Sequence, residues 1–164
     1  MEDARAVPPE PEDPMKVELS RWTMPVLRIG MGVFLVLWGF DKIIATEGSV
    51  RIFSAFYGIE SGPSVVQLAG GVEIVVGIAL ALGLLRVPVA WLQLAMNLVS
   101  TGASWKQILD PWGLLGLTRG GSHLFLASLV IMAASVVLVL NAREEFFTLD
   151  RRFAIAVRGG GEAP

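Results

Sequence analysis

Four long apolar segments alternate with shorter polar ones along the chain. An α-helix of about 20 mostly apolar residues is long enough to cross the hydrocarbon core of a bilayer. The pattern therefore predicts four membrane-spanning helices. The expected fold class is all-α: an integral membrane four-helix bundle with short amphipathic interfacial segments. The predicted spans cover residues 21–44, 64–85, 87–104 and 122–140.

Two of these spans carry an ionisable residue where lipid would make a charge costly. Arg28 lies in the first span and Glu73 lies in the second. A charge within the bilayer almost always faces protein or a water-filled cavity, so each residue is a candidate functional residue. Because their signs are opposite and their spans are consecutive, we expect the two side chains to meet inside the bundle.

Glycines recur beside both charges at helical spacing. Residues three and four positions apart share a face of an α-helix, and small residues on such a face let a neighbouring helix approach closely. Arg28 and Glu73 are therefore expected on faces that contact other helices. The glycines are Gly32 and Gly39 in the first span and Gly70 and Gly77 in the second.

The third span is the most polar of the four, and its polar stripe is expected to face the bundle interior. At a rise of about 1.5 Å per residue, Gln93 and Asn97 lie at depths close to that of Arg28. Together with Glu73, these residues are expected to form one polar cluster. Three interpretations stay open: an ion pair that fixes packing, a site for a small polar or quinone-like ligand, and a path for protons or ions.

A second polar group is expected at the opposite mouth of the bundle, where Asp41, Lys42 and His123 reach similar depths. The connectors on that side are too polar to span a membrane. In the first connector, residues 52–57 predict a short amphipathic turn in the interface. In the second, residues 110–113 predict a turn with interfacial tryptophans on both sides.

The two ends of the chain are expected to be tails around a membrane domain of residues 21–142. Residues 1–20 are acidic and rich in proline, which predicts a disordered N-tail, and residues 143–164 form the C-tail. Nine of the 13 lysines and arginines lie on the side of the two tails. By the positive-inside rule, we expect a multi-pass protein of the inner (cell) membrane with both termini cytoplasmic.

Composition narrows the chemistry that this chain can perform. Only 17% of the residues are charged and the net charge is −2, so no nucleic-acid partner is expected. The absence of cysteine excludes disulfides, thiol chemistry and iron–sulfur ligation by this chain. With His123 as the single histidine, the sequence predicts no metal site and no intrinsic cofactor.

Short motifs in the first two spans resemble those of the DoxX family of small four-span membrane proteins. The first span has the family's early arginine and late Gly-x-x-Lys, and the second span has its glutamate. The resemblance covers about residues 22–142. The segments that carry it are Leu27-Arg28-Ile29-Gly30, Gly39-Phe40-Asp41-Lys42, Gly70-Gly71-Val72-Glu73-Ile74 and Leu82-Gly83-Leu84, together with Gly77.

The resemblance implies a four-helix membrane bundle with a role in membrane redox chemistry. Some members of the family are linked to thiosulfate:quinone oxidoreduction, and others to oxidative-stress complexes. The chain is therefore expected to be an accessory or quinone-proximal subunit of a membrane redox system, with the polar cluster as its ligand or partner site. It is not expected to be a self-sufficient enzyme, because electron transfer would need a quinone, an oxidoreductase partner subunit or both.

Two other functions stay open from the sequence. A small-solute carrier or permease would use the same polar cluster to line a path through the bundle. A structural assembly subunit of a membrane complex would use the cluster for packing alone. The bilayer is the expected surrounding in each case, and a second copy of the chain is a further candidate partner.

Overall fold

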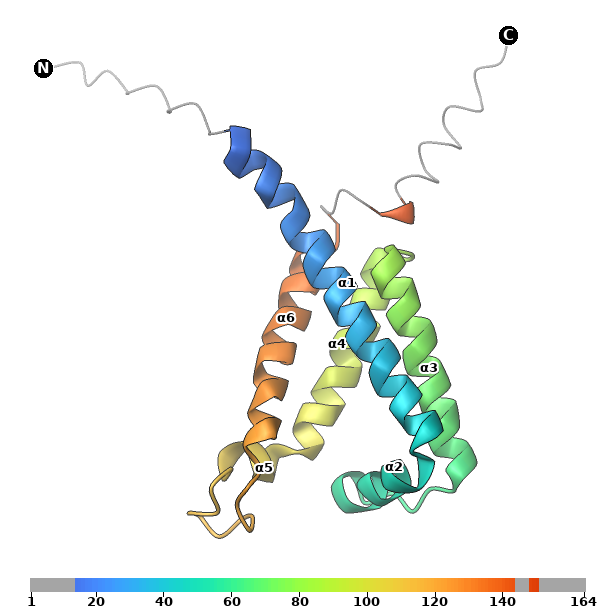
Figure 1. Ribbon diagram of the computed structural model, residues 1–164, viewed down its shortest axis with the longest axis vertical. Coiled ribbons are helices and arrows are strands. Elements are labelled where there is room, and N and C mark those ends of the chain that lie inside the picture. Colours follow the sequence, from blue (N-terminus) through green and yellow to red (C-terminus); the bar gives the residue numbers. More distant parts are fainter. Residues whose placement is uncertain (1–13, 144–147, 151–164) are drawn as a thin grey trace, which may run out of the picture.

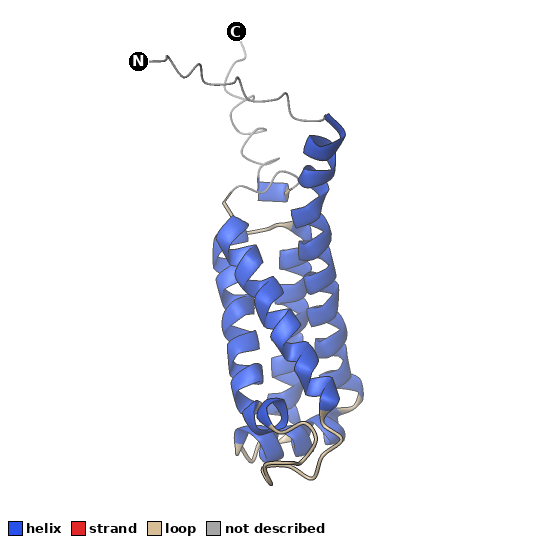
Figure 2. Ribbon diagram, turned by 90° about the vertical axis from the view of Figure 1, so that its left-hand side faces the viewer, coloured by secondary structure: helices blue, strands red, loops and turns tan. Residues whose placement is uncertain are grey.

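A computed structural model of the chain describes residues 14–143 and 148–150. Within these residues every regular element is a helix, as the sequence predicts, and four long helices run side by side, as Figure 1 and Figure 2 show. Short helices lie at one end of this bundle. The elements are α1 (Pro14–Ile44), α2 (Thr46–Ile52), η1 (Phe53–Tyr57), α3 (Pro63–Leu82), α4 (Arg86–Ala103), α5 (Trp105–Leu109), η2 (His123–Leu126) and α6 (Ala127–Asn141).

Three of the four long helices have the length and apolar composition needed to cross a bilayer. These spans are Arg21–Ile44 in α1, the whole of α3, and His123–Asn141, which η2 and α6 form together. The fourth long helix, α4, has 18 residues and runs beside these three, but Gln93 and Asn97 make it more polar than they are. The chain is therefore a multi-pass membrane protein, and the crossing by α4 stays a prediction.

The N-terminal boundary differs from the expected one. α1 begins at Pro14, so residues 14–20, which were expected to belong to the N-tail, form the first turns of this helix. Proline is favoured in the first turn of a helix, where its missing N–H is not needed, and the residues that follow it include good helix formers such as Leu19. Residues 1–13 and most of the predicted C-tail lie outside the described residues.

Glycines hold α1 and α3 together as an antiparallel pair. A Cβ atom built on Gly32 would lie 2.6 Å from the carbonyl oxygen of Gly77, and one built on Gly39 would lie 2.5 Å from that of Gly70. Real Cβ atoms do not approach an oxygen so closely, so only glycine fits at these four positions. The small-residue faces predicted from the sequence are confirmed as the contact between the two helices.

The second pair of helices, α4 and α6, packs against the first through an apolar core. Leu35 of α1 and Leu80 of α3 are buried in this core with Leu138 of α6. Many of the remaining apolar side chains on the long helices are exposed, among them Leu68 and Val75. An exposed apolar surface of this kind is expected of helices that face lipid.

Sharp turns place the ends of the helices. Gly83 ends α3 in the left-handed conformation (φ 68°). The Leu84 N–H bonds back to the Ala79 carbonyl over 2.9 Å, which is the hydrogen-bond pattern of a Schellman motif. At the other end of the bundle, the ring of Phe56 in η1 stacks on that of Phe125 in η2, with centroids 5.4 Å apart. This contact fixes the first connector against the start of the last span. The short turn predicted in that connector is helical.

Candidate functional site

The ionisable residue of α3 forms an ion pair with the last turns of α1. The Nζ atom of Lys42 donates a hydrogen bond of 2.7 Å to Oε2 of Glu73. Both side chains are largely shielded, with 10% and 15% of their surfaces exposed. An ion pair of this kind lowers the cost of holding two charges within a membrane-spanning segment, and each charge alone would be costly there.

The same local structure that joins the two helices makes room for this pair. Gly70 lies one turn of α3 from Glu73, and a Cβ atom on it would lie 2.9 Å from the Cβ atom of Lys42. The Nζ atom of Lys42 also lies 5.6 Å from the ring centroid of Trp38, at the edge of cation–π range. Trp38 itself is half exposed and stacks on Phe34, with centroids 5.6 Å apart. The pair therefore borders an aromatic surface that faces lipid.

A separate, uncharged polar centre joins α4 to α6. The side-chain amides of Gln93 and Asn97 both donate to the hydroxyl oxygen of Ser135, over 2.9 Å and 2.8 Å. The Ser135 hydroxyl in turn donates to the carbonyl of Ile131, one turn earlier in the same helix, over 2.6 Å. The inward-facing polar stripe predicted for the third span is confirmed at these two positions, which are buried.

This centre leaves one acceptor without a donor among the described residues. The Oε1 atom of Gln93 is buried and accepts no hydrogen bond there. A buried amide oxygen without a donor costs free energy, which a donor on a water molecule or a ligand would recover. Chemically, the centre can therefore accept one more hydrogen bond.

Arg28 lies apart from the Lys42–Glu73 pair, at the end of the bundle where α3 turns into α4. Its side chain approaches Gly83, which is ten residues and about 15 Å along α3 from Glu73. The predicted meeting of Arg28 with Glu73, and the single cluster built on it, are therefore wrong. The antiparallel pairing of the glycines sets the register of α1 on α3, and this register puts Lys42 beside the carboxylate instead. Arg28 lines a cavity of about 10 Å³, room for about one water molecule.

The predicted group at the opposite mouth is not formed either. Lys42 points into the bundle and binds Glu73, whereas Asp41, at the preceding position of the helix, is exposed. His123 is exposed at the start of η2, where its ring and that of Trp112 form a T-shaped contact with centroids 5.5 Å apart. Within the described residues, no three His, Cys, Asp or Glu side chains are grouped so that they could hold a metal ion.

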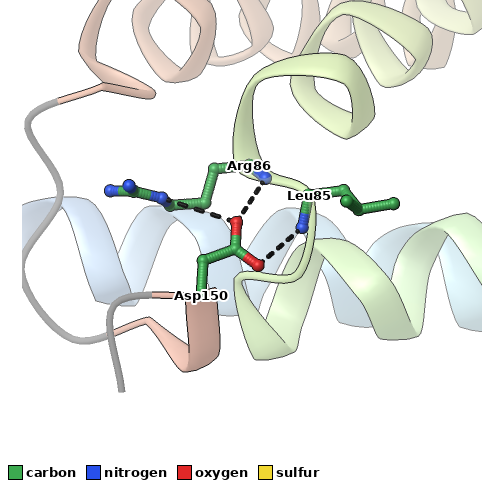
Figure 3. Close-up of polar contacts among 3 residues, drawn as sticks. All are labelled: Leu85, Arg86 and Asp150. Carbon is green, nitrogen blue, oxygen red and sulfur yellow. Dashed lines mark hydrogen bonds and ion pairs between the residues drawn. The ribbon is translucent and has the colours of Figure 1, made fainter. Parts of the chain in front are cut away.

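Sequence reasoning missed two residues that organise these sites. In the sequence, Ser135 differs little from Ser128, which lies seven residues earlier in the same apolar span. Asp150 lies in the predicted C-tail, and its carboxylate accepts hydrogen bonds of 3.0 Å from the backbone N–H groups of Leu85 and Arg86, as Figure 3 shows. It also forms an ion pair of 3.6 Å with the Arg86 side chain. A carboxylate at a helix N-terminus stabilises the free N–H groups there, so Asp150 docks the C-terminal segment onto the start of α4.

Comparison with known proteins identifies one relationship. The model of the DoxX family matches residues 23–105, about half of the chain, from the first turns of the α1 span to the start of α5. The matched part contains the Lys42–Glu73 pair and the two amides of α4, but not Ser135. No curated protein and no solved structure gives a significant match.

Proposed function

The chain belongs to the DoxX family of membrane proteins, and from this premise we propose that it is an accessory, quinone-proximal subunit of a membrane redox system. In this role the chain holds a quinone head group near the lipid-facing side of α1, and a partner oxidoreductase supplies the electrons. The observation that carries the proposal is the ion pair of Lys42 and Glu73 beside the exposed ring of Trp38.

The chemistry of this site suits a quinone. A quinone head group has two carbonyl oxygens that accept hydrogen bonds, and the Lys42 ammonium group carries three N–H donors, of which Glu73 uses one. The flat ring of the quinone can pack on the half-exposed face of Trp38, and its apolar tail can stay in the lipid that this face borders. An apolar surface with a few orienting polar groups is the usual composition of a ligand site.

The ion pair also fits the proton balance of quinone reduction. Conversion of a quinone to a quinol takes two electrons, which the partner oxidoreductase would provide, and two protons. The lysine ammonium group can donate one proton to a reduced quinone oxygen. The glutamate is ionised in the pair, so it can take up a proton from water and pass it to the lysine for the second donation. A further proton from water then restores the ammonium group, so that water supplies both protons of the quinol. A proton donor, Lys42, and a proton acceptor, Glu73, are therefore in contact where the reduced head group would form.

Isolation from native membranes tests this proposal. The tagged full chain is extracted in mild detergent, and the quinone and the proteins that accompany it are quantified by chromatography and mass spectrometry. We expect an oxidoreductase to accompany the chain, together with quinone above the level of the bulk lipid. Glu73→Gln and Lys42→Met should reduce the quinone and leave the oxidoreductase in place.

Two results would contradict the redox proposal. Equal quinone in all three samples would show that quinone enters with lipid alone. An oxidoreductase that is missing while other complex subunits are present would favour the structural assembly function instead. The cavity beside Arg28 has room for about one water molecule, so this cavity by itself does not favour a carrier function.

A further inference from the structure

The loop between α5 and η2 exposes more large apolar side chains than a water-facing loop would. We name residues 110–121 the leucine loop. Leu114 and Leu115 at its tip are 84% and 68% exposed, and Leu117 and Trp112 are also exposed. Apolar residues flank the loop on both sides, since Leu109 at the end of α5 and Leu124 in η2 are exposed as well. Together they form one apolar surface outside the long helices.

One carboxylate inside the leucine loop accepts hydrogen bonds from several of its backbone N–H groups. Asp110 is 2% exposed, and its side chain accepts hydrogen bonds from the N–H groups of Leu115, Leu117 and Thr118 over 2.9–3.3 Å. The Thr118 hydroxyl closes the arrangement by donating to the Asp110 carbonyl over 2.6 Å. A non-helical backbone can enter an apolar medium only when its polar groups find partners inside the protein, and these three N–H groups do so.

Close backbone contact fixes the base of the loop. A Cβ atom on Gly120 would lie 2.9 Å from the Trp112 carbonyl oxygen, and Gly120 has a φ of 80°, so the position requires glycine. The Ser122 N–H donates to the Pro111 carbonyl over 3.1 Å and ties the end of the loop to its start. The leucine side chains therefore project from a closed and internally bonded frame. Figure 1 shows this loop at the end of the bundle that holds α5, on the side away from α3.

We propose that the leucine loop inserts its leucines into the interfacial layer of the bilayer and anchors this end of the bundle to lipid. The residues around it are those that favour the headgroup region: Trp105 and Trp112 supply aromatic rings, and Lys106 and Arg119 supply exposed cations. The apolar surface is also continuous with the lipid-facing start of the last span at Leu124. A lipid bilayer therefore matches this surface, because its hydrocarbon can contact the apolar side chains while its headgroups contact the cations that border them.

Spin labelling tests the insertion directly, because the chain contains no cysteine. Leu114→Cys is compared with the control Glu60→Cys, which lies at an exposed polar position after η1. The full-length variants carry a nitroxide label in nanodiscs of phosphatidylcholine and phosphatidylglycerol. Power saturation then gives the collision rate of each label with oxygen, which is concentrated in lipid, and with a water-soluble nickel chelate. We expect the ratio of oxygen to nickel collisions to be several-fold higher at position 114 than at position 60.

Two results would overturn the proposal. Equal ratios at the two positions would place the loop in water. A label at position 114 that is shielded from both oxygen and nickel would show that protein, such as a second copy of the chain, covers the loop instead of lipid. If Leu114→Cys does not fold, Leu115→Cys replaces it with the same expected result.

A second variant separates insertion from a chance apolar exposure. Asp110→Asn removes the charge that holds the loop backbone and leaves the side-chain shape nearly unchanged. In the Leu114→Cys background, this substitution should lower the ratio of oxygen to nickel collisions toward that of position 60, while circular dichroism shows an unchanged helix content. An unchanged ratio would contradict the assigned role of Asp110.

Discussion

Lys42 Nζ and Glu73 Oε2 lie 2.7 Å apart, and they join the last turns of α1 to the middle of α3. The pair lies between the membrane-spanning segments of two helices that touch backbone to backbone at Gly39 and Gly70. Close helix contact and charge pairing therefore depend on the same few residues. This arrangement makes the pair both a charged contact between the two spans and the centre of the proposed quinone site.

We predict that Lys42 and Glu73 are energetically coupled. Lys42→Met and Glu73→Gln should each lower the free energy of unfolding in detergent, because each leaves a partner charge in an apolar surrounding. The double variant should lose less than the sum, with a coupling energy of about 0.5–3 kcal/mol. Thermal or denaturant unfolding of the four proteins in the cycle gives this energy.

A second double-mutant cycle serves as the control and pairs Glu73 with Arg28 instead of Lys42. Because the Arg28 side chain approaches Gly83, about 15 Å along α3 from Glu73, Arg28→Met and Glu73→Gln should be additive to within about 0.5 kcal/mol. Additive effects for Lys42 together with coupling for Arg28 would contradict the register of α1 on α3.

The glycine contact predicts opposite effects for two neighbouring substitutions. Gly70→Ala should destabilise the protein by about 1–3 kcal/mol, because the new methyl group would lie 2.6 Å from the Gly39 carbonyl oxygen. Gly71→Ala is the control: its Cβ atom would meet nothing within 4 Å, and alanine favours a helix over glycine by about 1 kcal/mol. Thermal unfolding by scanning fluorimetry measures both, and equal melting temperatures would argue against the close α1–α3 contact.

Ser135 should matter more than the other serine of its helix. Ser135→Ala removes the acceptor of two buried amides, Gln93 and Asn97, and should cost about 1–3 kcal/mol. Ser128→Ala is the matched control, since its hydroxyl donates only to the Phe125 carbonyl one turn earlier. Chemical denaturation of both variants compares the two serines. A loss no larger for Ser135 than for Ser128 would mean that the amide centre does not hold α4 to α6.

Asp110 predicts a dependence of loop stability on pH. Burial raises the pKa of this carboxyl, but hydrogen bonds from the loop backbone N–H groups outweigh burial, so its pKa lies below the ordinary value. A lowered pKa in the folded state means that the stabilisation is complete above the ordinary aspartate pKa of about 3.9 and is lost as the pH falls through the lowered value.

Hydrogen exchange of the loop amides across acidic pH, corrected for the intrinsic rate, measures this effect. Protection at Leu115 and Leu117 should be constant from neutral pH down to about 4 and should fall below it. Asp110→Asn should show low protection with no such step. Protection that increases as the pH is lowered through the acidic range would instead indicate a raised pKa and would contradict this prediction.

The helices and their small-residue faces could be predicted because each depends on local periodicity. Gly32, Gly39, Gly70 and Gly77 occupy the predicted contact face, and the buried Gln93 occupies the predicted polar stripe. The orientation of the termini stays a prediction. These features need only the spacing of residues within one helix.

The partners of the charges could not be predicted, because they depend on the register between two helices. The sequence places Arg28 and Lys42 in the same span, and opposite sign alone does not choose between them. Pairing the glycines of the two spans in antiparallel order would have pointed to Lys42. Ser135 and Asp150 were missed for a different reason: a serine in an apolar span and an aspartate in a tail are common, and only tertiary contacts distinguish these two.

The proposed quinone site is tested most directly by the emission of Trp38. The other four tryptophans are replaced by phenylalanine, and the purified protein is titrated with a short-chain quinone. We predict saturable quenching of Trp38 that is weakened at least several-fold in Lys42→Met and Glu73→Gln and is unchanged in Gly71→Ala. Quenching that rises linearly with quinone and is the same in all four proteins would show partitioning into detergent alone and would contradict a quinone site at Lys42 and Glu73.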